Sequence, residues 1–283
     1  MCATCGCSGR ARLRLVRDGE VAGDLAERHG HDHEFHHEHD YEPVTGAWEG
    51  EEEEEEEERP HDHARHRTVL LQQKVLAKND AIAANNRAWL RDRGVLAVNL
   101  MSSPGAGKTT LLERTAGDLA GDPRISVIEG DQETALDASR ISATGVSVVQ
   151  INTGAGCHLD AAMVERALYT LDPLPGSVVM IENVGNLVCP ALFDLGETAR
   201  IVLASVTEGA DKPVKYPHMF RRADLVLVTK ADLLPYVDFD VARHAADVKR
   251  LSPDARMIQV SATTGEGMAD WYSWLRLSLP VRG

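Results

Sequence analysis

This sequence has few aromatic residues and no long apolar stretch, and its cysteines are not spread evenly along the chain. Aromatic residues make up 5% of the 283 residues, and no apolar run approaches the roughly 18–20 residues that span a bilayer. The first 30 residues lack the apolar core of a secretory signal. The five cysteines are not distributed as in a small disulfide scaffold. We therefore expect a cytoplasmic protein without a membrane span, and nothing in the composition indicates a nucleic acid partner.

The charge of the chain is concentrated at its amino end. Residues 1–66 hold 19 acidic against 7 basic residues, so most of the formal net charge of −14 lies there. The same stretch holds nine of the twelve histidines, three of the five cysteines and the glutamate run from Glu51 to Glu58. Mutual repulsion of like charges opposes compaction. These features predict a metal-binding, largely disordered tail over residues 1–67.

After the tail, the pattern changes to that of a folded domain. Apolar residues recur at about helical spacing from Thr68 to Arg93, which predicts a leading helix over residues 68–94. Over residues 95–283, short β-branched runs alternate with helical patterns, as in a mostly parallel α/β sheet covered by helices on both faces. The expected strands are Val95–Met101, Ile125–Gly130, Val146–Ile151, Ser177–Glu182, Ile201–Val206, Leu225–Thr229 and Met257–Val260.

The first of these strands leads into a phosphate-binding pattern, Ser102-Ser103-Pro104-Gly105-Ala106-Gly107-Lys108-Thr109, in which Ser102 replaces the usual first glycine. Small residues let backbone N–H groups turn toward phosphate oxygens, and the following helix amino terminus favours an anion. Lys108 is expected to reach the β- and γ-phosphates and to act in catalysis. An ordinary glycine-rich turn is the alternative, but strand, loop and helix coincide here, which indicates a P-loop NTPase. The predicted nucleotide-binding residues of the loop are Gly105, Ala106, Gly107, Lys108, Thr109 and Thr110.

Guanine is the base that the next motif favours. Thr229-Lys230-Ala231-Asp232 follows an expected strand and resembles the Asn-Lys-x-Asp pattern, with Thr229 in place of Asn. A carboxylate at Asp232 can accept from both N1–H and the 2-amino group of guanine, whereas adenine offers no such pair. Ser261 and Ala262, after the last strand, are placed to present backbone N–H groups to the base.

Two acidic strand ends complete the expected nucleotide site. Asp131 and Glu182 each end a strand, and together with Thr109 they are predicted to hold Mg²⁺. Asp131 is also expected to orient the attacking water, although it could instead cap the next helix. The backbone N–H of Gly185, after Glu182, is placed to sense the γ-phosphate.

Thiols and imidazoles form two candidate sites for Ni²⁺ or Zn²⁺. Cys157, His158 and Cys189 follow expected strands near the Glu182 segment, although two buried thiols and an ordinary histidine are the simpler interpretation. Cys2, Cys5 and Cys7 bring three soft ligands together at the amino end, a set that suits Ni²⁺, with Zn²⁺ as a competitor. Weaker imidazole sites are expected at His29, His31, His33, His36, His37, His39, His61, His63 and His66.

These segments resemble the hydrogenase nickel-incorporation GTPases, the HypB family, across residues 68–283. The resemblance is carried by the phosphate loop through Thr110, by residues 182–190 and 206–217, and by the motif from Thr229 to Asp232. Glutamate at position 182 stands where most GTPases have aspartate, and the long glutamate run departs from the family pattern.

The resemblance implies a slow GTPase that uses Mg²⁺, forms a GTP-dependent homodimer and delivers Ni²⁺ to the hydrogenase large subunit. It also implies a partner metallochaperone of the HypA family, a metal site of Cys157, His158 and Cys189 at the dimer interface, and a guanine contact from Lys212 or Lys215. A urease-type nickel GTPase and a nickel or zinc storage protein are the alternative functions. Storage accounts for the tail but not for the nucleotide motifs.

Overall fold

The computed structural model describes residues 11–17, 20–24, 60–119, 121–132 and 136–280. The described residues up to Asp24 and those from Lys74 onward form one compact unit, which contains the sheet. A second unit contains the first turns of α1, from Pro60 to Gln73. No helix within the described ranges combines the length and the apolarity that a bilayer crossing requires.

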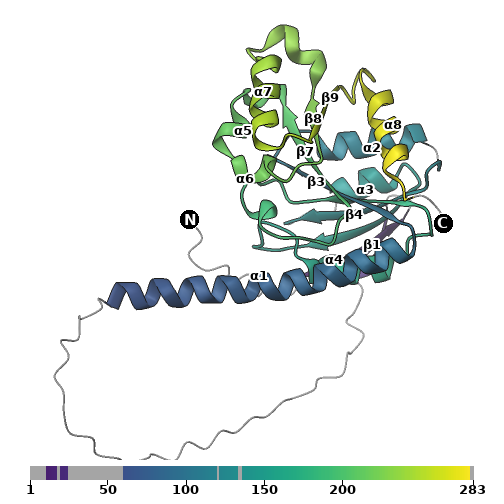
Figure 1. Ribbon diagram of the computed structural model, residues 1–283. Coiled ribbons are helices and arrows are strands. Elements are labelled where there is room, and N and C mark those ends of the chain that lie inside the picture. Colours follow the sequence, from purple (N-terminus) through teal and green to yellow (C-terminus); the bar gives the residue numbers. More distant parts are fainter. Residues whose placement is uncertain (1–10, 18–19, 25–59, 120, 133–135, 281–283) are drawn as a thin grey trace, which may run out of the picture. The chain divides into compact units, whose positions relative to one another are not determined.

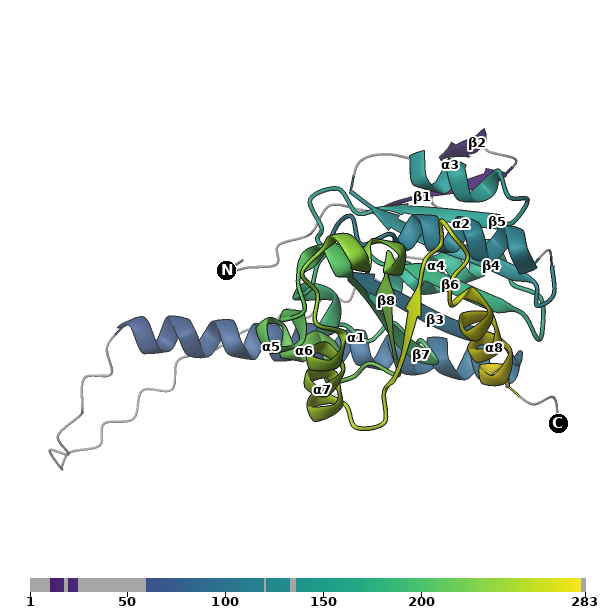
Figure 2. The ribbon, with the colours of Figure 1, turned by 90° about the horizontal axis from the view of Figure 1, so that it is seen from above.

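One sheet of nine strands runs through the first unit in the order β2-β1-β5-β4-β6-β3-β7-β8-β9 (Figure 2). The seven strands from β3 to β9 are parallel, whereas β1 pairs antiparallel with both β2 and β5. The strands are β1 Arg12–Arg17, β2 Glu20–Asp24, β3 Leu96–Ser102, β4 Ile125–Asp131, β5 Ser147–Asn152, β6 Val178–Glu182, β7 Ala199–Ser205, β8 Leu225–Thr229 and β9 Arg256–Val260.

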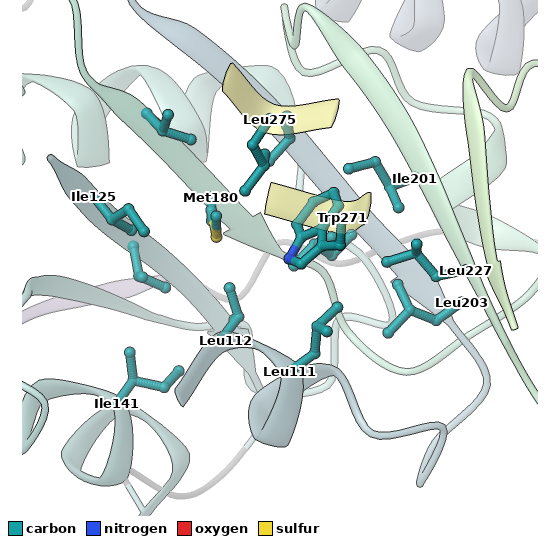
Figure 3. Close-up of a cluster of buried hydrophobic side chains, with 14 of the residues drawn as sticks. Leu111, Leu112, Ile125, Ile141, Met180, Ile201, Leu203, Leu227, Trp271 and Leu275 are labelled. Carbon is teal, nitrogen blue, oxygen red and sulfur yellow. The ribbon is translucent and has the colours of Figure 1, made fainter. Parts of the chain in front are cut away.

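Helices cover both faces of the sheet, as the sequence predicts (Figure 1). One face packs against α2, α3 and α8, and Figure 3 shows Trp271 and Leu275 of α8 beside Met180 of β6. The other face packs against α4, α6, α7 and the last turns of α1. The helices are α1 Pro60–Asp92, α2 Lys108–Leu119, α3 Leu136–Ser142, α4 Ala161–Leu171, α5 Lys212–Lys215, α6 Pro217–Phe220, α7 Val241–Leu251 and α8 Met268–Ser278, and the 3₁₀ turns are Cys189–Ala191, Val206–Glu208 and Ala231–Tyr236.

All seven strands expected in the domain are present, each within two residues of its expected ends. Because these strands are parallel, the loops that follow them all emerge at the same edge of the sheet. That edge therefore gathers the phosphate loop, the acidic strand ends, the guanine motif and the candidate metal loops, as in other open α/β sheets.

The amino-terminal region differs from the expectation of a tail without regular structure. Residues 12–17 and 20–24 form a hairpin, and α1 begins at Pro60 instead of Thr68. Ala11 and Leu13 alternate with arginines, and this period of two matches a strand buried on one side. The charged composition of the region outweighed this short alternation in the prediction, so the expected disorder is wrong for this hairpin. Residues 25–59 lie outside the described part of the chain.

Candidate functional site

The phosphate loop joins β3 to α2 and places a buried ammonium group behind the loop. Lys108 is the first residue of α2, and its Nζ donates to Ser102 Oγ at 3.0 Å. Lys108 is 8% exposed, and burial lowers its pKa, an effect that the charge of Glu182 opposes. Gly105 and Gly107 have φ of 74° and 95°, a region that glycine adopts without strain. A buried cation at a helix amino terminus suits a phosphate group.

Thr109 and Glu182 form the next part of the site. Thr109 Oγ1 donates to Glu182 Oε1 at 2.9 Å. Glu182 is 6% exposed, and burial raises its pKa to about 7. Its second oxygen, Oε2, is buried and has no hydrogen-bond partner among the described residues. A hydroxyl group beside a carboxylate with an unsatisfied oxygen is a donor set that Mg²⁺ favours, so the residues fit the expected ion.

Glu129, which sequence reasoning did not assign, adds a second carboxylate to this region. It lies directly across from Glu182 in the β4–β6 pairing and is 2% exposed. Burial raises its pKa well above the usual value, and the charges of Glu182 and Asp131 add to this effect. The signal in the sequence was periodicity, because Ile125, Val127 and Glu129 alternate onto one face of β4.

Asp131 ends β4 at the same edge, as expected. Its backbone carbonyl accepts from Thr153 N at 2.8 Å, which ties it to the loop after β5. The described part of the next helix, α3, begins at Leu136. Residues 133–135, where a cap from Asp131 would act, lie outside the described residues, so the helix-cap alternative stays open.

The guanine motif lies against the phosphate loop. Thr229 Oγ1 donates to Ala106 O at 2.7 Å, and Lys230 Nζ donates to Gly105 O at 2.9 Å. Between these segments is a cavity of about 160 Å³. The residues that line it are Ala106, Gly107, Thr110, Leu111, Thr229, Lys230, Asp232, Leu233, Val260, Ala262 and Thr263. The structure thus brings together three segments that lie far apart in the sequence. Leu233 is a lining residue that the sequence did not single out.

Three residues that were predicted to contact the base do not face the base cavity in the structure. The backbone N–H of Ser261 donates to Glu266 O at 2.9 Å, so it closes its own turn instead of facing the cavity. Lys212 Nζ lies 3.5 Å from Ser103 Oγ of the phosphate loop, and Lys215 pairs with Asp211 at 2.7 Å. Neither lysine lines the base cavity of its own chain.

Cys157, His158 and Cys189 come together as the sequence predicts. Their ligand atoms all lie within 4.8 Å of one another, and among the described residues no other group of three His, Cys, Asp or Glu side chains does so. His158 is 7% exposed and stacks on Phe193, with ring centroids 3.9 Å apart. Burial lowers the pKa of His158, which favours the neutral imidazole that binds metals. Two thiols and an imidazole suit Ni²⁺ or Zn²⁺.

Hydrogen bonds connect this triad to the strand end that carries Glu182. Asn183, 1% exposed, accepts with Oδ1 from Leu159 N at 3.2 Å, one residue after His158. Asn186 Nδ2 donates to Cys157 O at 3.4 Å. Nothing in the sequence distinguishes these two asparagines from the rest of their motif, because their partners are more than 20 residues away.

Gly185 lies between those asparagines and touches the phosphate loop. A Cβ atom added at Gly185 would lie 2.9 Å from Pro104 Cα. The backbone of this segment therefore packs directly on the loop. The role of Gly185 as a sensor of the γ-phosphate stays a prediction.

The other candidate metal ligands lie outside the described residues or their described side chains. Cys2, Cys5 and Cys7 belong to residues 1–10, and the histidines from His29 to His39 belong to residues 25–59. His61, His63 and His66 lie in α1, in turns whose side chains are not described. The tail sites therefore stay predictions.

Comparison with known proteins agrees with the motifs. The family model described as CobW/HypB/UreG, nucleotide-binding domain, matches residues 96–259, a range that begins after α1. The hydrogenase maturation factor HypB of Rhizobium leguminosarum bv. viciae is 54% identical over 219 residues, which cover 77% of this chain and 73% of that protein.

Two solved structures share the fold at considerable identity. The crystal structure of hydrogenase maturation factor HypB from Archaeoglobus fulgidus has a TM-score of 0.68 at 41% identity and covers 72% of this chain and 100% of its own. The crystal structure of HypB from Helicobacter pylori in complex with nickel has a TM-score of 0.68 at 40% identity and covers 73% of this chain and 99% of its own. The chain described here belongs to the HypB family of hydrogenase maturation factors.

Proposed function

We propose that this protein hydrolyses GTP and uses the nucleotide to control Ni²⁺ at Cys157, His158 and Cys189, for insertion into the large subunit of a [NiFe]-hydrogenase. The observation that carries the proposal is a pair of hydrogen bonds with the loop that holds Cys157 and His158: Asn183 accepts from Leu159 N, and Asn186 donates to Cys157 O. Because Asn183 directly follows Glu182, a change at the nucleotide site has a short route to the metal ligands.

The nucleotide site has the groups that GTP hydrolysis needs. Lys108 neutralises the β- and γ-phosphates, and Asp131 orients the attacking water. Thr109, Asp131 and Glu182 would hold Mg²⁺, which would supply positive charge to the phosphates. Asp232 reads the donor pair of guanine, and Ala262 presents its backbone to the base.

The metal site is proposed to lie at the interface of a GTP-dependent homodimer. Val188 and Leu192 flank Cys189 and are 55% and 51% exposed, an apolar surface that a second copy would cover. Lys215, whose side chain is 62% exposed, is then available to the nucleotide of the other copy. The Helicobacter pylori relative was solved in complex with nickel, which supports Ni²⁺, with Zn²⁺ as the competitor. Thiolate ligands require a reducing compartment, so we place the protein in the cytoplasm.

Cys2, Cys5 and Cys7 are proposed as a separate metal site, and the tail histidines as weaker ones. A HypA-family metallochaperone is the proposed partner that receives or supplies the ion. A storage protein would also use such a tail, but storage does not require a response to GTP.

The test uses the full chain with Cys2, Cys5 and Cys7 replaced by serine. Only Cys157 and Cys189 then remain as thiols, so thiolate-to-nickel absorption reports the triad and not the histidines. We expect Ni²⁺ affinity to differ at least five-fold between the protein with GDP and the protein with a non-hydrolysable GTP analogue. By linkage, Ni²⁺ must then change the ratio of the affinities for the two nucleotides by the same factor. Equal Ni²⁺ affinities in both states would refute the proposal and favour storage.

A further inference from the structure

The part of α1 that packs on the sheet unit carries two asparagines on its buried face. Asn79, Ala83, Asn86 and Leu90 recur at helical spacing and are 6%, 0%, 3% and 1% exposed. A buried amide requires hydrogen-bond partners, and none of the four positions of this stripe faces water. The partners of the two amides therefore show what this face of the helix holds.

Both asparagines bridge the same two segments. Asn79 Oδ1 accepts from Ala161 N at 2.9 Å, and Asn79 Nδ2 donates to Asp194 O at 2.7 Å. Asn86 Nδ2 donates to Ala161 O at 2.9 Å and to Leu195 O at 3.0 Å. The backbone of Ala161 is thus held at both its N–H and its carbonyl group, and the loop at 194–195 is held at two carbonyl groups.

Those two segments are the ones that carry the metal ligands. Ala161, the first residue of α4, lies three residues after His158. Asp194 lies five residues after Cys189 and directly after Phe193, the ring that stacks on His158. The separation of the two ligand segments is therefore fixed from the side by a helix that supplies no ligand.

Close packing reinforces this connection. Gly196 has φ of 87°, and a Cβ atom there would lie 2.5 Å from Ala83 O and 2.5 Å from Asn86 Cβ. The loop consequently approaches the helix as closely as only glycine permits. Displacement of α1 toward this loop would therefore be expected to displace the loop as well.

We propose that Asn79 and Asn86 are positioning residues that set the geometry of Cys157, His158 and Cys189 for the metal ion. The inference rests on the proposed metal site but not on nucleotide coupling. It assigns to α1 a role in metal affinity. This role is separate from nucleotide binding, because none of the described hydrogen bonds joins α1 to the phosphate loop or to the guanine motif.

The test again uses the full chain with Cys2, Cys5 and Cys7 replaced by serine, with Asn79→Ala, Asn86→Ala and the milder Asn79→Ser. The matched control is Arg87→Ala, which removes an exposed ion pair to Asp194 from the same helix. We expect each asparagine variant to bind Ni²⁺ at least ten-fold more weakly and to shift its thiolate-to-nickel absorption, with GDP affinity within two-fold. Arg87→Ala should leave Ni²⁺ affinity and absorption unchanged.

The outcomes separate this inference from the proposed function. If the parent itself shows no thiolate-to-nickel absorption, the metal site of the proposed function fails. If the parent shows it and all three asparagine variants keep the parent affinity and spectrum, the positioning role is refuted. Parallel loss of GDP binding in all three would also overturn it, because the asparagines would then support the fold as a whole.

Discussion

The nucleotide site and the metal triad share one edge of the sheet but are held in place in different ways. Lys108 and Thr109 belong to a single loop-helix segment whose contacts with Ser102 and Glu182 are made at strand ends. The triad lies on two loops that are fixed by side chains from elsewhere, Asn183 of the β6 end and Asn79 and Asn86 of α1. Motifs that are each contiguous in the sequence therefore supply the first site, whereas amides from distant segments hold the loops of the second.

The largest effect should come from breaking the nucleotide site alone. Lys108→Ala removes the buried ammonium group, and Asp232→Ala removes the acceptor for the guanine donors, each at a cost of several kcal/mol at a desolvated contact. We expect GTP affinity to fall more than 100-fold in each variant while Ni²⁺ affinity of the nucleotide-free protein changes less than two-fold. Isothermal titration calorimetry measures both.

A base-specific control accompanies these variants. Asp232→Asn should shift preference toward xanthine nucleotides, because an amide can donate to the additional carbonyl group of xanthine. If GTP affinity were unchanged in both Lys108→Ala and Asp232→Ala, the assignment of this site as a GTP site would be wrong.

The next largest effect should come from the hairpin β1–β2. Val16 of β1 is 0% exposed and Leu13 is 9% exposed, and β1 covers the edge of β5, which leads into the metal loop. Deletion of residues 1–24 should lower the free energy of unfolding by about 3–5 kcal/mol, whereas deletion of residues 1–10 removes only the tail cysteines. Urea denaturation measures this difference.

The same pair of deletions sharpens the comparison of the two sites. Because β5 is next to β1 and β3 is three strands further in, loss of the hairpin should weaken Ni²⁺ binding more than GDP binding. An equal loss of both would show that the two sites depend on the sheet edge in the same way.

The sequence predicted what depends on neighbours along the chain. The seven parallel strands, the phosphate loop and the cavity beside Asp232 follow from periodicity and contiguous motifs, and the structure contains them all. The grouping of Cys157, His158 and Cys189 followed because parallel strands end at one edge. These features need no knowledge of tertiary contacts beyond the sheet itself.

What the sequence did not predict depends on contacts between distant residues. Asn79 reads as a polar residue in a helix, and only its bonds to Ala161 and Asp194 give it a role. Val75, one of the apolar residues that recur at about helical spacing between Thr68 and Arg93, is 56% exposed, because the buried stripe of the helix runs through Asn79 and Asn86. Helical periodicity of apolar residues cannot reveal a face that is partly amide.

A smaller effect on stability should come from the charge of Glu182, which lies between the phosphate loop and the segment that leads to the metal triad. Burial raises its pKa from 4.5 to about 7, so the folded protein keeps a proton that the unfolded chain loses as pH rises from about 4.5 to about 7. Stability without nucleotide or Mg²⁺ should therefore fall over that range and level off above it. Glu182→Gln removes this cost, which the attraction to Lys108 already reduces, and should stabilise the protein by about 3 kcal/mol at pH 8. Thermal unfolding at pH 5 and pH 8 tests the sign, and a gain at pH 5 as large as at pH 8 would contradict it.

The smallest effect on stability should come from Asn183→Ala, which tests whether the two sites communicate through this side chain. The variant leaves the N–H groups of Leu159 and Val184 without their acceptor, at a cost of about 2 kcal/mol in unfolding free energy. The phosphate contacts do not change, so GDP affinity should stay within three-fold of the parent, whereas Ni²⁺ affinity should fall because the loop of His158 loses one of its supports. The dependence of Ni²⁺ affinity on nucleotide should nevertheless disappear. The end of β6, which we expect to move with the γ-phosphate, is no longer bonded to the loop of His158 in this variant. Full dependence in the variant would mean that the coupling runs through Asn186 or through the dimer, and that the two sites are joined by more than the Asn183 side chain.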